Sequence, residues 1–136
     1  MSDRLSNTDP RLSDSLGAAA PELRSRAATL AAQASVSSTN LNRDDRFATL
    51  DPHDLPGLRA LVETLDNEYF DLQDKLELGQ TSESSVDDAF GKARSASSLV
   101  FLAEGQTNEA IYEALSAVSD PTAILTLIER ALTQST

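Results

Sequence analysis

The clearest hydrophobic pattern in the sequence lies in its middle, between residues 55 and 78. Apolar and aromatic residues recur there at alternating steps of three and four, as in a helix that buries one seam against a neighbouring helix. The seam consists of Leu55, Leu58, Val62, Leu65, Tyr69, Leu72 and Leu76. Asp54 and Pro56 are typical of a helix start, and Gly79 is typical of a helix end. The pattern therefore predicts a long helix over residues 56–78.

The opposite face of this predicted helix is acidic. It carries Glu63, Asp66, Glu68, Asp71, Asp74 and Glu77, relieved only by Arg59 and Lys75. An amphipathic helix can use its apolar seam within its own domain or offer it to another chain. We therefore expect partner-binding residues on both faces of the helix. The candidates on the seam are Leu58, Val62, Leu65, Tyr69, Leu72 and Leu76, and those on the acidic face are Glu63, Asp66, Asp71 and Asp74.

Three further helices are predicted after the long one. A helix over residues 85–104 has an apolar face of mostly small residues, which favours close antiparallel packing on the long helix. Gly91 lies inside it, and this glycine marks either a close helix crossing or a tolerated weak spot of the helix. Thr107 and the pair Asp120-Pro121 are start signals for a C-terminal helical hairpin over residues 107–133. The predicted fold is all-α, a small bundle of four to five helices built on the long central helix.

The first 54 residues carry weaker patterns. Residues 1–20 are polar and rich in serine, and we predict that they are disordered. An unfolded export signal of the type III secretion kind is the alternative interpretation of this stretch. Pro21 favours the start of an Ala-rich helix that ends near Ala34, and residues 35–54 have the composition of a linker. Within that linker, residues 42–50 are compatible with a short helical turn anchored by Phe47 and Leu50. The predicted organisation is a disordered 1–20, a helix and linker over 21–54, and a helical domain over 55–136.

Composition and charge limit the partners of the chain. Only 4% of its 136 residues are aromatic, and 22 acidic residues against 11 basic ones give a net charge of −11. Such a field repels phosphate groups, so we expect no direct binding to nucleic acid and no membrane partner. There is no cysteine and no apolar stretch of the roughly 20 residues that a membrane span requires. We therefore expect a cytoplasmic protein, with export through a specialised secretion system as the alternative.

Residues 101–121, FLAEGQTNEAIYEALSAVSDP, resemble the second half of a tetratricopeptide unit. The residues that carry the resemblance are Phe101, Gly105, Ala110, Ala117 and Pro121. The sequence departs from the unit at Ser98, where glycine is expected, and at Arg94, where tryptophan or tyrosine is expected. The chain contains no second copy, whereas a solenoid needs about three stacked units. The resemblance implies a helical hairpin, and we assign no family from it.

Candidate chemistry is sparse. His53, between Asp51 and Asp54, is the single histidine, and neither a nucleophile nor the three or four ligands of a zinc site accompany it. The sequence has no glycine-rich phosphate loop and no serine hydrolase motif. We therefore expect no cofactor, no metal ion and no enzymatic activity.

These observations favour a non-enzymatic protein–protein interaction module, such as an adaptor, a chaperone or a component of an assembly or secretion system. The expected partner is another protein with a basic surface, and a second copy of the chain is the other candidate. The alternative function is an acidic inhibitor of a basic partner, as immunity proteins, antitoxins and nucleic-acid mimics are. An enzyme would need a site assembled from Asp, Glu, Tyr and Ser that the spacing does not reveal.

Overall fold

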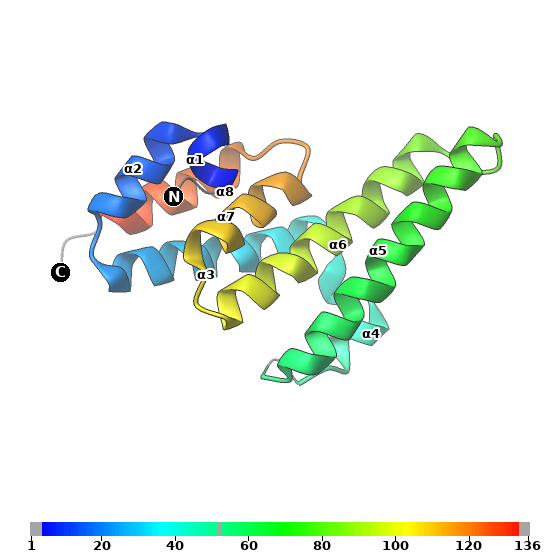
Figure 1. Ribbon diagram of the computed structural model, residues 1–136, viewed down its shortest axis with the longest axis horizontal. Helices are drawn as coiled ribbons and strands as arrows, with labels where there is room; N and C mark the ends of the chain where they lie inside the picture. The colour runs from blue at the N-terminus through cyan, green and yellow to red at the C-terminus, as the bar shows by residue number, and fades with distance from the viewer. Residues whose placement is uncertain (1–3, 52, 134–136) are drawn as a thin grey trace.

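A computed structural model describes residues 4–51 and 53–133, and it confirms the all-α prediction (Figure 1). The described residues contain no strand. Their helices are α1 (Arg4–Thr8), α2 (Pro10–Ala18), α3 (Pro21–Ser38), the 3-10 turn η1 (Leu41–Arg43), α4 (Asp45–Ala48), α5 (Leu55–Glu77), α6 (Glu83–Ala103), α7 (Thr107–Ala117) and α8 (Thr122–Thr133).

Helix α6 is the element that joins the two parts of the molecule. It pairs with α5 along one side, and its second half packs against α7 and α3. Helix α3 in turn packs on α7 and α8. Figure 1 shows the consequence: α5 and α6 form a hairpin whose closed end projects away from the body formed by α1, α2, α3, α7 and α8.

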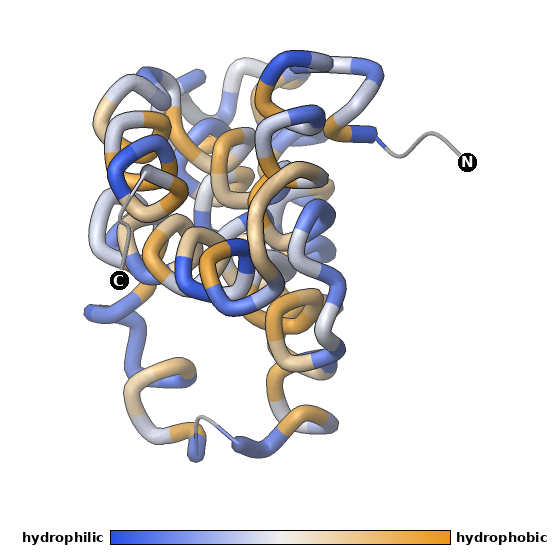
Figure 2. The backbone as a smooth tube through the Cα atoms, turned by 90° about the vertical axis from the view of Figure 1, so that its left-hand side faces the viewer, coloured by the Kyte–Doolittle hydropathy of each residue, from blue (hydrophilic) through white to orange (hydrophobic). Residues whose placement is uncertain are grey.

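The long predicted helix is present as α5, and its start follows from local capping. The side chain of Asp54 accepts a hydrogen bond from the Gly57 amide, and a proline stands in the first turn. Asp54 thus gives the free Gly57 amide a hydrogen-bond partner, and the proline has no N–H group that needs one. Both features favour a helix start at this position. Figure 2 shows apolar and polar residues alternating along the helices, as expected of amphipathic segments.

The core divides into two clusters that contain many small side chains. The first joins α1, α2, α3, α7 and α8, and its floor on α3 consists of the fully buried Ala27, Ala28 and Ala31. The second lies between α5, α6 and the segment after α3, and it includes Leu41, Leu61, Leu65, Ala93 and Ala96. Small side chains allow helix axes to approach closely, so α3, α6 and α7 pack tightly despite burying few large residues.

Polar bonds and one glycine hold these close crossings. Ser35 on α3 and Ser95 on α6 share a buried hydrogen bond of 2.9 Å, and the Ser98 hydroxyl donates to the Ala110 carbonyl on α7 at 2.6 Å. A Cβ atom on Gly91 would lie 2.7 Å from the Ala117 carbonyl oxygen. The interpretation of Gly91 as a close helix crossing is therefore confirmed.

The structure corrects the expectation that residues 1–20 are disordered, as far as it describes them. Residues 4–18 form α1 and α2, and Leu5, Leu12 and Leu16 are buried in the first core cluster. Asp9 caps α2 by accepting from the Leu12 amide, and Pro10 occupies its first turn. The three leucines are isolated in the sequence but find a common apolar surface on other helices, which pattern reasoning does not reveal. Residues 1–3 of that prediction lie outside the described part.

The expected linker is shorter than the sequence indicated, and the short helical turn expected at residues 42–50 is present. Helix α3 continues to Ser38, four residues beyond the predicted end near Ala34, and the next residues form η1 and α4. Asn40 takes a left-handed backbone conformation, φ 61°, which turns the chain so that Leu41 becomes fully buried. Helix α3 is an integral part of the fold, because it lies against α6, α7 and α8.

Candidate protein interaction surface on the α5–α6 hairpin

The seam candidates on α5 divide into buried and half-buried residues. Leu58 and Leu65 are 3% and 2% exposed, so they belong to the core and do not face a partner. Leu61, which the seam omitted, is also buried. A straight α-helix has 3.6 residues per turn, so a strict 3.5-residue seam drifts away from the true buried stripe. The remaining seam residues, Val62, Tyr69, Leu72 and Leu76, are half-buried.

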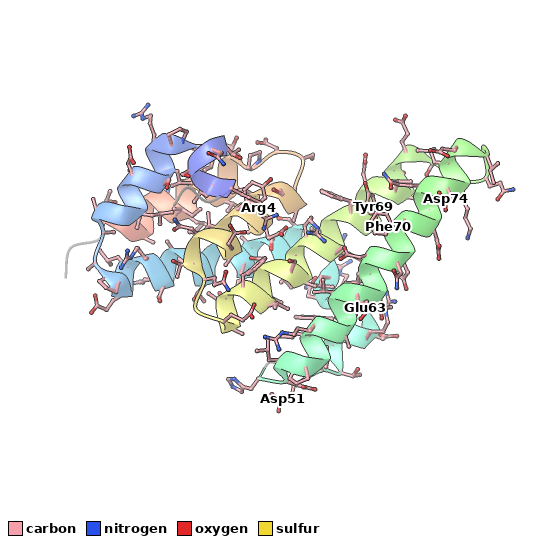
Figure 3. All side chains as sticks on the ribbon, in the orientation of Figure 1. Arg4, Asp51, Glu63, Tyr69, Phe70 and Asp74 are labelled. Carbon is pink, nitrogen blue, oxygen red and sulfur yellow. The ribbon has the colours of Figure 1, made fainter. Side chains whose placement is uncertain are left out.

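Beyond Leu65 the hairpin carries a row of aromatic rings. The Tyr69 ring on α5 lies 5.2 Å from the Phe90 ring on α6, centroid to centroid, and 5.4 Å from the ring of Phe70. The Tyr69 hydroxyl accepts a 2.7 Å hydrogen bond from the Gln73 side chain. Phe90 and Tyr69 therefore join the two helices, and Phe70 extends the row to the surface (Figure 3).

Phe70 and Leu78 are the large hydrophobic residues that the described structure leaves exposed, at 56% and 72%. Residues three or four apart lie on the same face of a helix. The face of α5 that carries Phe70 therefore also carries acidic residues one turn before and after it. We name this face the outer stripe, and it consists of Glu63, Asp66, Phe70, Asp74, Glu77 and Leu78. The sequence analysis missed Phe70 and Leu78, although their four-residue spacing from Asp66 and Asp74 is visible in the sequence.

The acidic candidates differ in what they contact. Glu63, Asp71 and Asp74 are exposed and form no ion pair with any residue in the described ranges. Asp66 instead accepts a 2.6 Å hydrogen bond from Arg94 on α6, so its carboxylate already has a partner inside the hairpin. Three of the four acidic candidates thus remain free to meet a basic group.

The outer part of the hairpin holds most of the net charge of the chain. Residues 66–88 contain eight carboxylates and one lysine, a net charge of −7 out of the −11 of the whole sequence. Among these carboxylates only Asp66 and Glu68 form ion pairs within the described residues, with Arg94 and Arg46. The surface around Phe70 therefore attracts positive charge.

The inner end of the hairpin is fixed by a chain of charged side chains. Glu113 on α7 is 2% exposed and accepts from Arg94 at 3.2 Å and from Arg4 on α1 at 2.9 Å. Arg4 also donates through Nε to Glu109 at 2.9 Å and lies over the Tyr112 ring. Burial opposes the charge of Arg4, but its hydrogen bonds to Glu109 and Glu113 outweigh this and raise its pKa. This chain links α1, α7, α6 and α5.

A second ionic contact attaches α4 to the middle of α5. Arg46 donates to Asp44 at 2.7 Å and pairs with Glu68 on α5. The hydrogen bond from the Arg46 side chain lowers the pKa of Asp44 from its ordinary 3.8 to about 2, and Lys92 adds to the effect from 3.7 Å. Both partners are charged at neutral pH, so the contact is a structural clamp and not a proton donor for chemistry.

Within the described ranges, no group of three or more His, Cys, Asp or Glu side chains is arranged to hold a metal ion. His53 is exposed beside Asp51, whose carboxylate accepts from the His53 backbone amide. None of the helices that the structure describes has the length and apolar character needed to cross a membrane.

Comparison with known proteins gives no family for this chain. No family model, characterised protein or solved structure matches it. The tetratricopeptide resemblance of residues 101–121 accordingly describes only the packing of α6, α7 and the start of α8. Function is inferred from the geometry of the described residues.

Proposed function

We propose that this protein is a non-enzymatic protein–protein interaction module that binds a basic protein through the outer half of its α5–α6 hairpin. The observation that carries the proposal is the position of Phe70 and Leu78. They are exposed on the same face that bears Asp74 and Glu77, whose carboxylates form no ion pair in the described residues. An exposed apolar group framed by charge is typical of a binding site.

The chemistry of the outer stripe favours an arginine-rich partner surface. An arginine can stack its guanidinium on the face of Phe70 and donate hydrogen bonds to a neighbouring carboxylate in the same pose. Aromatic residues such as Phe70 are frequent centres of interfaces, whereas carboxylates at the rim speed association and select the partner. The hairpin therefore supplies both an anchor and an attractive field.

The same charge disfavours a second copy of this chain as the partner at this surface. Two outer hairpin halves, each with a net charge of −7 over residues 66–88, repel one another at short range. A heterologous basic partner removes that repulsion. The alternative function, an acidic inhibitor of a basic protein, shares this surface and differs only in what binding does to the partner.

The test compares capture of proteins from a native lysate by the wild-type protein and by two variants. Phe70→Ser/Leu78→Ser removes the apolar anchor, and Asp71→Asn/Asp74→Asn removes two charges. Asp14→Asn/Glu22→Gln, on the body of the molecule, is the matched charge control. We expect a basic protein to be retained by the wild type and the control, and at least tenfold less by the anchor variant.

Salt separates the contributions of charge and apolar contact. Raising the ionic strength screens exposed charges, so retention by the wild type should fall, and the Asp71→Asn/Asp74→Asn variant should respond less steeply. Equal retention by the wild type and the anchor variant, at every salt concentration, would contradict the proposal. Purified partner can then be tested for loss of its own activity, which distinguishes an inhibitor from an adaptor.

A further inference from the structure

The first two helices form a short segment that is attached to the body by one face. Residues 4–18 are followed directly by Ala19 and Ala20, which lead into α3. The segment buries Leu5, Leu12 and Leu16 in a groove. The groove is lined by Ala27, Ala28, Ala31, Ile111, Ile124, Ile128 and Ala131 from α3, α7 and α8. The segment thus sits on the rest of the fold as a bound amphipathic peptide would.

One charged side chain anchors the start of this segment. Arg4 donates to Glu109 and Glu113 on α7, and its guanidinium carbon lies 4.3 Å from the centre of the Tyr112 ring. The second carboxylate is almost fully buried, so the anchor lies at an acidic rim of the groove. Recognition by the groove therefore combines an arginine with the three leucines that follow it.

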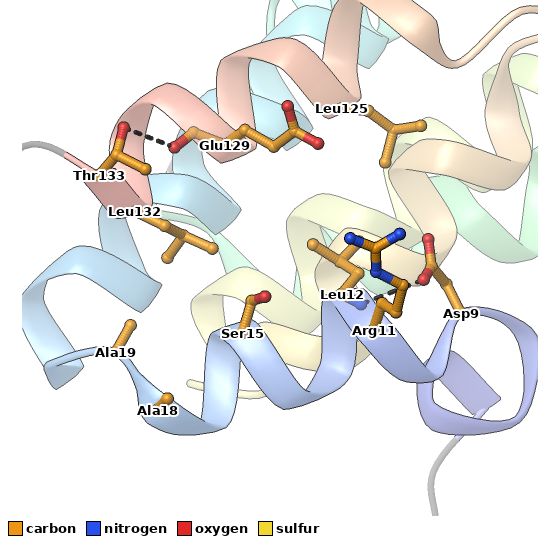
Figure 4. Close-up of a pocket in the computed structure, with 10 residues that line it drawn as sticks. All are labelled: Asp9, Arg11, Leu12, Ser15, Ala18, Ala19, Leu125, Glu129, Leu132 and Thr133. Carbon is orange, nitrogen blue, oxygen red and sulfur yellow. Dashed lines mark hydrogen bonds between the residues drawn. The ribbon is translucent and has the colours of Figure 1, made fainter.

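The other side of α2 is not packed. A cleft of about 590 Å³ separates α2 from α8, with Ser15 and Ala18 on one wall and Leu125 and Leu132 on the other (Figure 4). The cleft is open to solvent, so α8 does not cover this side of α2, whereas Leu12 and Leu16 on the other side are buried. Arg11 borders the cleft and forms no ion pair with the residues that the structure describes.

We propose that the groove on α3, α7 and α8 is a second docking surface for an amphipathic helix that carries an arginine followed by leucines. Residues 4–18 occupy this groove in the structure and give way when such a helix competes for it. The chemistry of the incoming helix is that of the present occupant. Local opening of a terminal segment requires much less free energy than global unfolding, so exchange can occur while the hairpin stays folded.

The probe is a fluorescent synthetic peptide of residues 4–20, added to the full-length protein and followed by anisotropy. A tethered segment competes with the peptide, so weakening the tethered segment tightens peptide binding by the same factor. Arg4→Ala in the protein, with the wild-type peptide, should strengthen binding about tenfold, since charge-assisted hydrogen bonds of the tethered segment are lost. Arg11→Ala is the matched control, because it removes the same charge from the same segment without breaking an ion pair.

A peptide that itself carries Arg4→Ala should bind about tenfold more weakly than the wild-type peptide, both to the wild-type protein and to the Arg4→Ala protein. Hydrogen exchange gives an independent readout: in the Arg4→Ala protein, residues 4–18 should exchange about tenfold faster and α5 and α6 unchanged. The proposal would be overturned if the peptide did not bind the Arg4→Ala protein, or if the Arg11→Ala control gained as much peptide affinity as the Arg4→Ala protein. It would also be overturned if Arg4→Ala reduced protection from hydrogen exchange throughout the chain, because the segment would then be an integral part of the fold.

Discussion

The two halves of the α5–α6 hairpin consist of the same two helices, but other helices cover the inner half and leave the outer half uncovered. The inner half buries Leu58, Leu61 and Leu65 of α5, and its Arg94 binds both Asp66 and the buried Glu113. The outer half leaves Phe70 and Leu78 exposed, and most of its carboxylates form no ion pair in the described residues.

The comparison shows that one supersecondary element can be covered by other helices at one end and uncovered at the other. The inner half lies against α7, α3 and α4, and there the large apolar residues are covered and Arg94 is paired with Asp66 and Glu113. The outer half projects beyond these helices, so only α5 and α6 cover one another (Figure 1). The proposed binding surface has to stay uncovered in the free protein, and the projection of the hairpin is compatible with this requirement.

The substitution with the largest expected effect on stability is Glu113→Ala, on α7 beside the inner half. It removes the buried carboxylate that Arg4 and Arg94 share, but Arg4 keeps Glu109 and Arg94 keeps Asp66, so we expect a loss of about 1.5–3 kcal/mol for the lost charged hydrogen bonds. Urea unfolding should show this loss in the free energy of unfolding. Glu63→Ala on the outer stripe is the control and should change the free energy by less than about 0.5 kcal/mol. Similar small losses for both variants would show that the inner half is not held by its charges.

Gly91→Ala tests the close crossing at the inner half. The added methyl would lie 2.7 Å from the Ala117 carbonyl oxygen, so α6 and α7 must separate. We expect a loss of about 1–3 kcal/mol in the free energy of unfolding, as overpacked interiors show. Gly17→Ala is the control, because a Cβ there meets nothing within 4 Å. That variant should be neutral or stabilised by a few tenths of a kcal/mol, since alanine reduces the freedom of the unfolded chain.

Acid should weaken the contact between α4 and the hairpin through Asp44. The hydrogen bond from Arg46 lowers the folded-state pKa of Asp44 from 3.8 to about 2, so its stabilising effect is complete above about pH 4 and is lost as the pH falls toward 2. We expect a loss of roughly 1 kcal/mol over this window, after allowance for solvent screening of the half-exposed Arg46. Unfolding curves at several pH values measure it. Asp44→Asn should remove this part of the pH dependence; an unchanged dependence would exclude Asp44 as its source.

Phe70→Ala should have the smallest effect on stability. Its ring is more than half exposed, so we expect a change within about 0.5 kcal/mol in the free energy of unfolding. The measurement sharpens the comparison when it is combined with partner capture, because the outer half should lose binding without losing stability. A large loss of stability would instead identify Phe70 as part of the aromatic packing with Tyr69.

The elements that the sequence predicted well are those with local signals. The capping residue Asp54 and the apolar repeat after it predicted a helix over 56–78, against the observed Leu55–Glu77. The glycine at position 91 likewise indicated a crossing without naming its partner. Such signals depend on neighbours within a few residues, which is why they can be read without a structure.

The elements that were missed depend on distant contacts. The groove that buries Leu5, Leu12 and Leu16 is built largely from α7 and α8, about a hundred residues further along the chain. Arg4 and Glu113 are 109 residues apart, and no spacing rule joins them. Helix α3 looked weakly amphipathic because its alanines are buried against several helices rather than along one stripe.

The candidate site was predicted only in outline. The sequence located it on the long helix and identified its acidic character, but it assigned the apolar contact to the seam. In the structure, Leu58 and Leu65 of that seam are buried in the core, whereas Phe70 and Leu78 are exposed. Which apolar residues remain exposed depends on how far neighbouring helices extend, and this is a property of the whole fold.

The small-residue interface between α3 and α6 has a thermodynamic consequence. Alanine and serine expose little apolar area to water when the chain unfolds, and the heat capacity of unfolding scales with that area. Alanine also has no rotamers to restrict on folding. We therefore expect the free energy of unfolding of this protein to vary little with temperature. A core of leucine and phenylalanine would give a more strongly curved dependence.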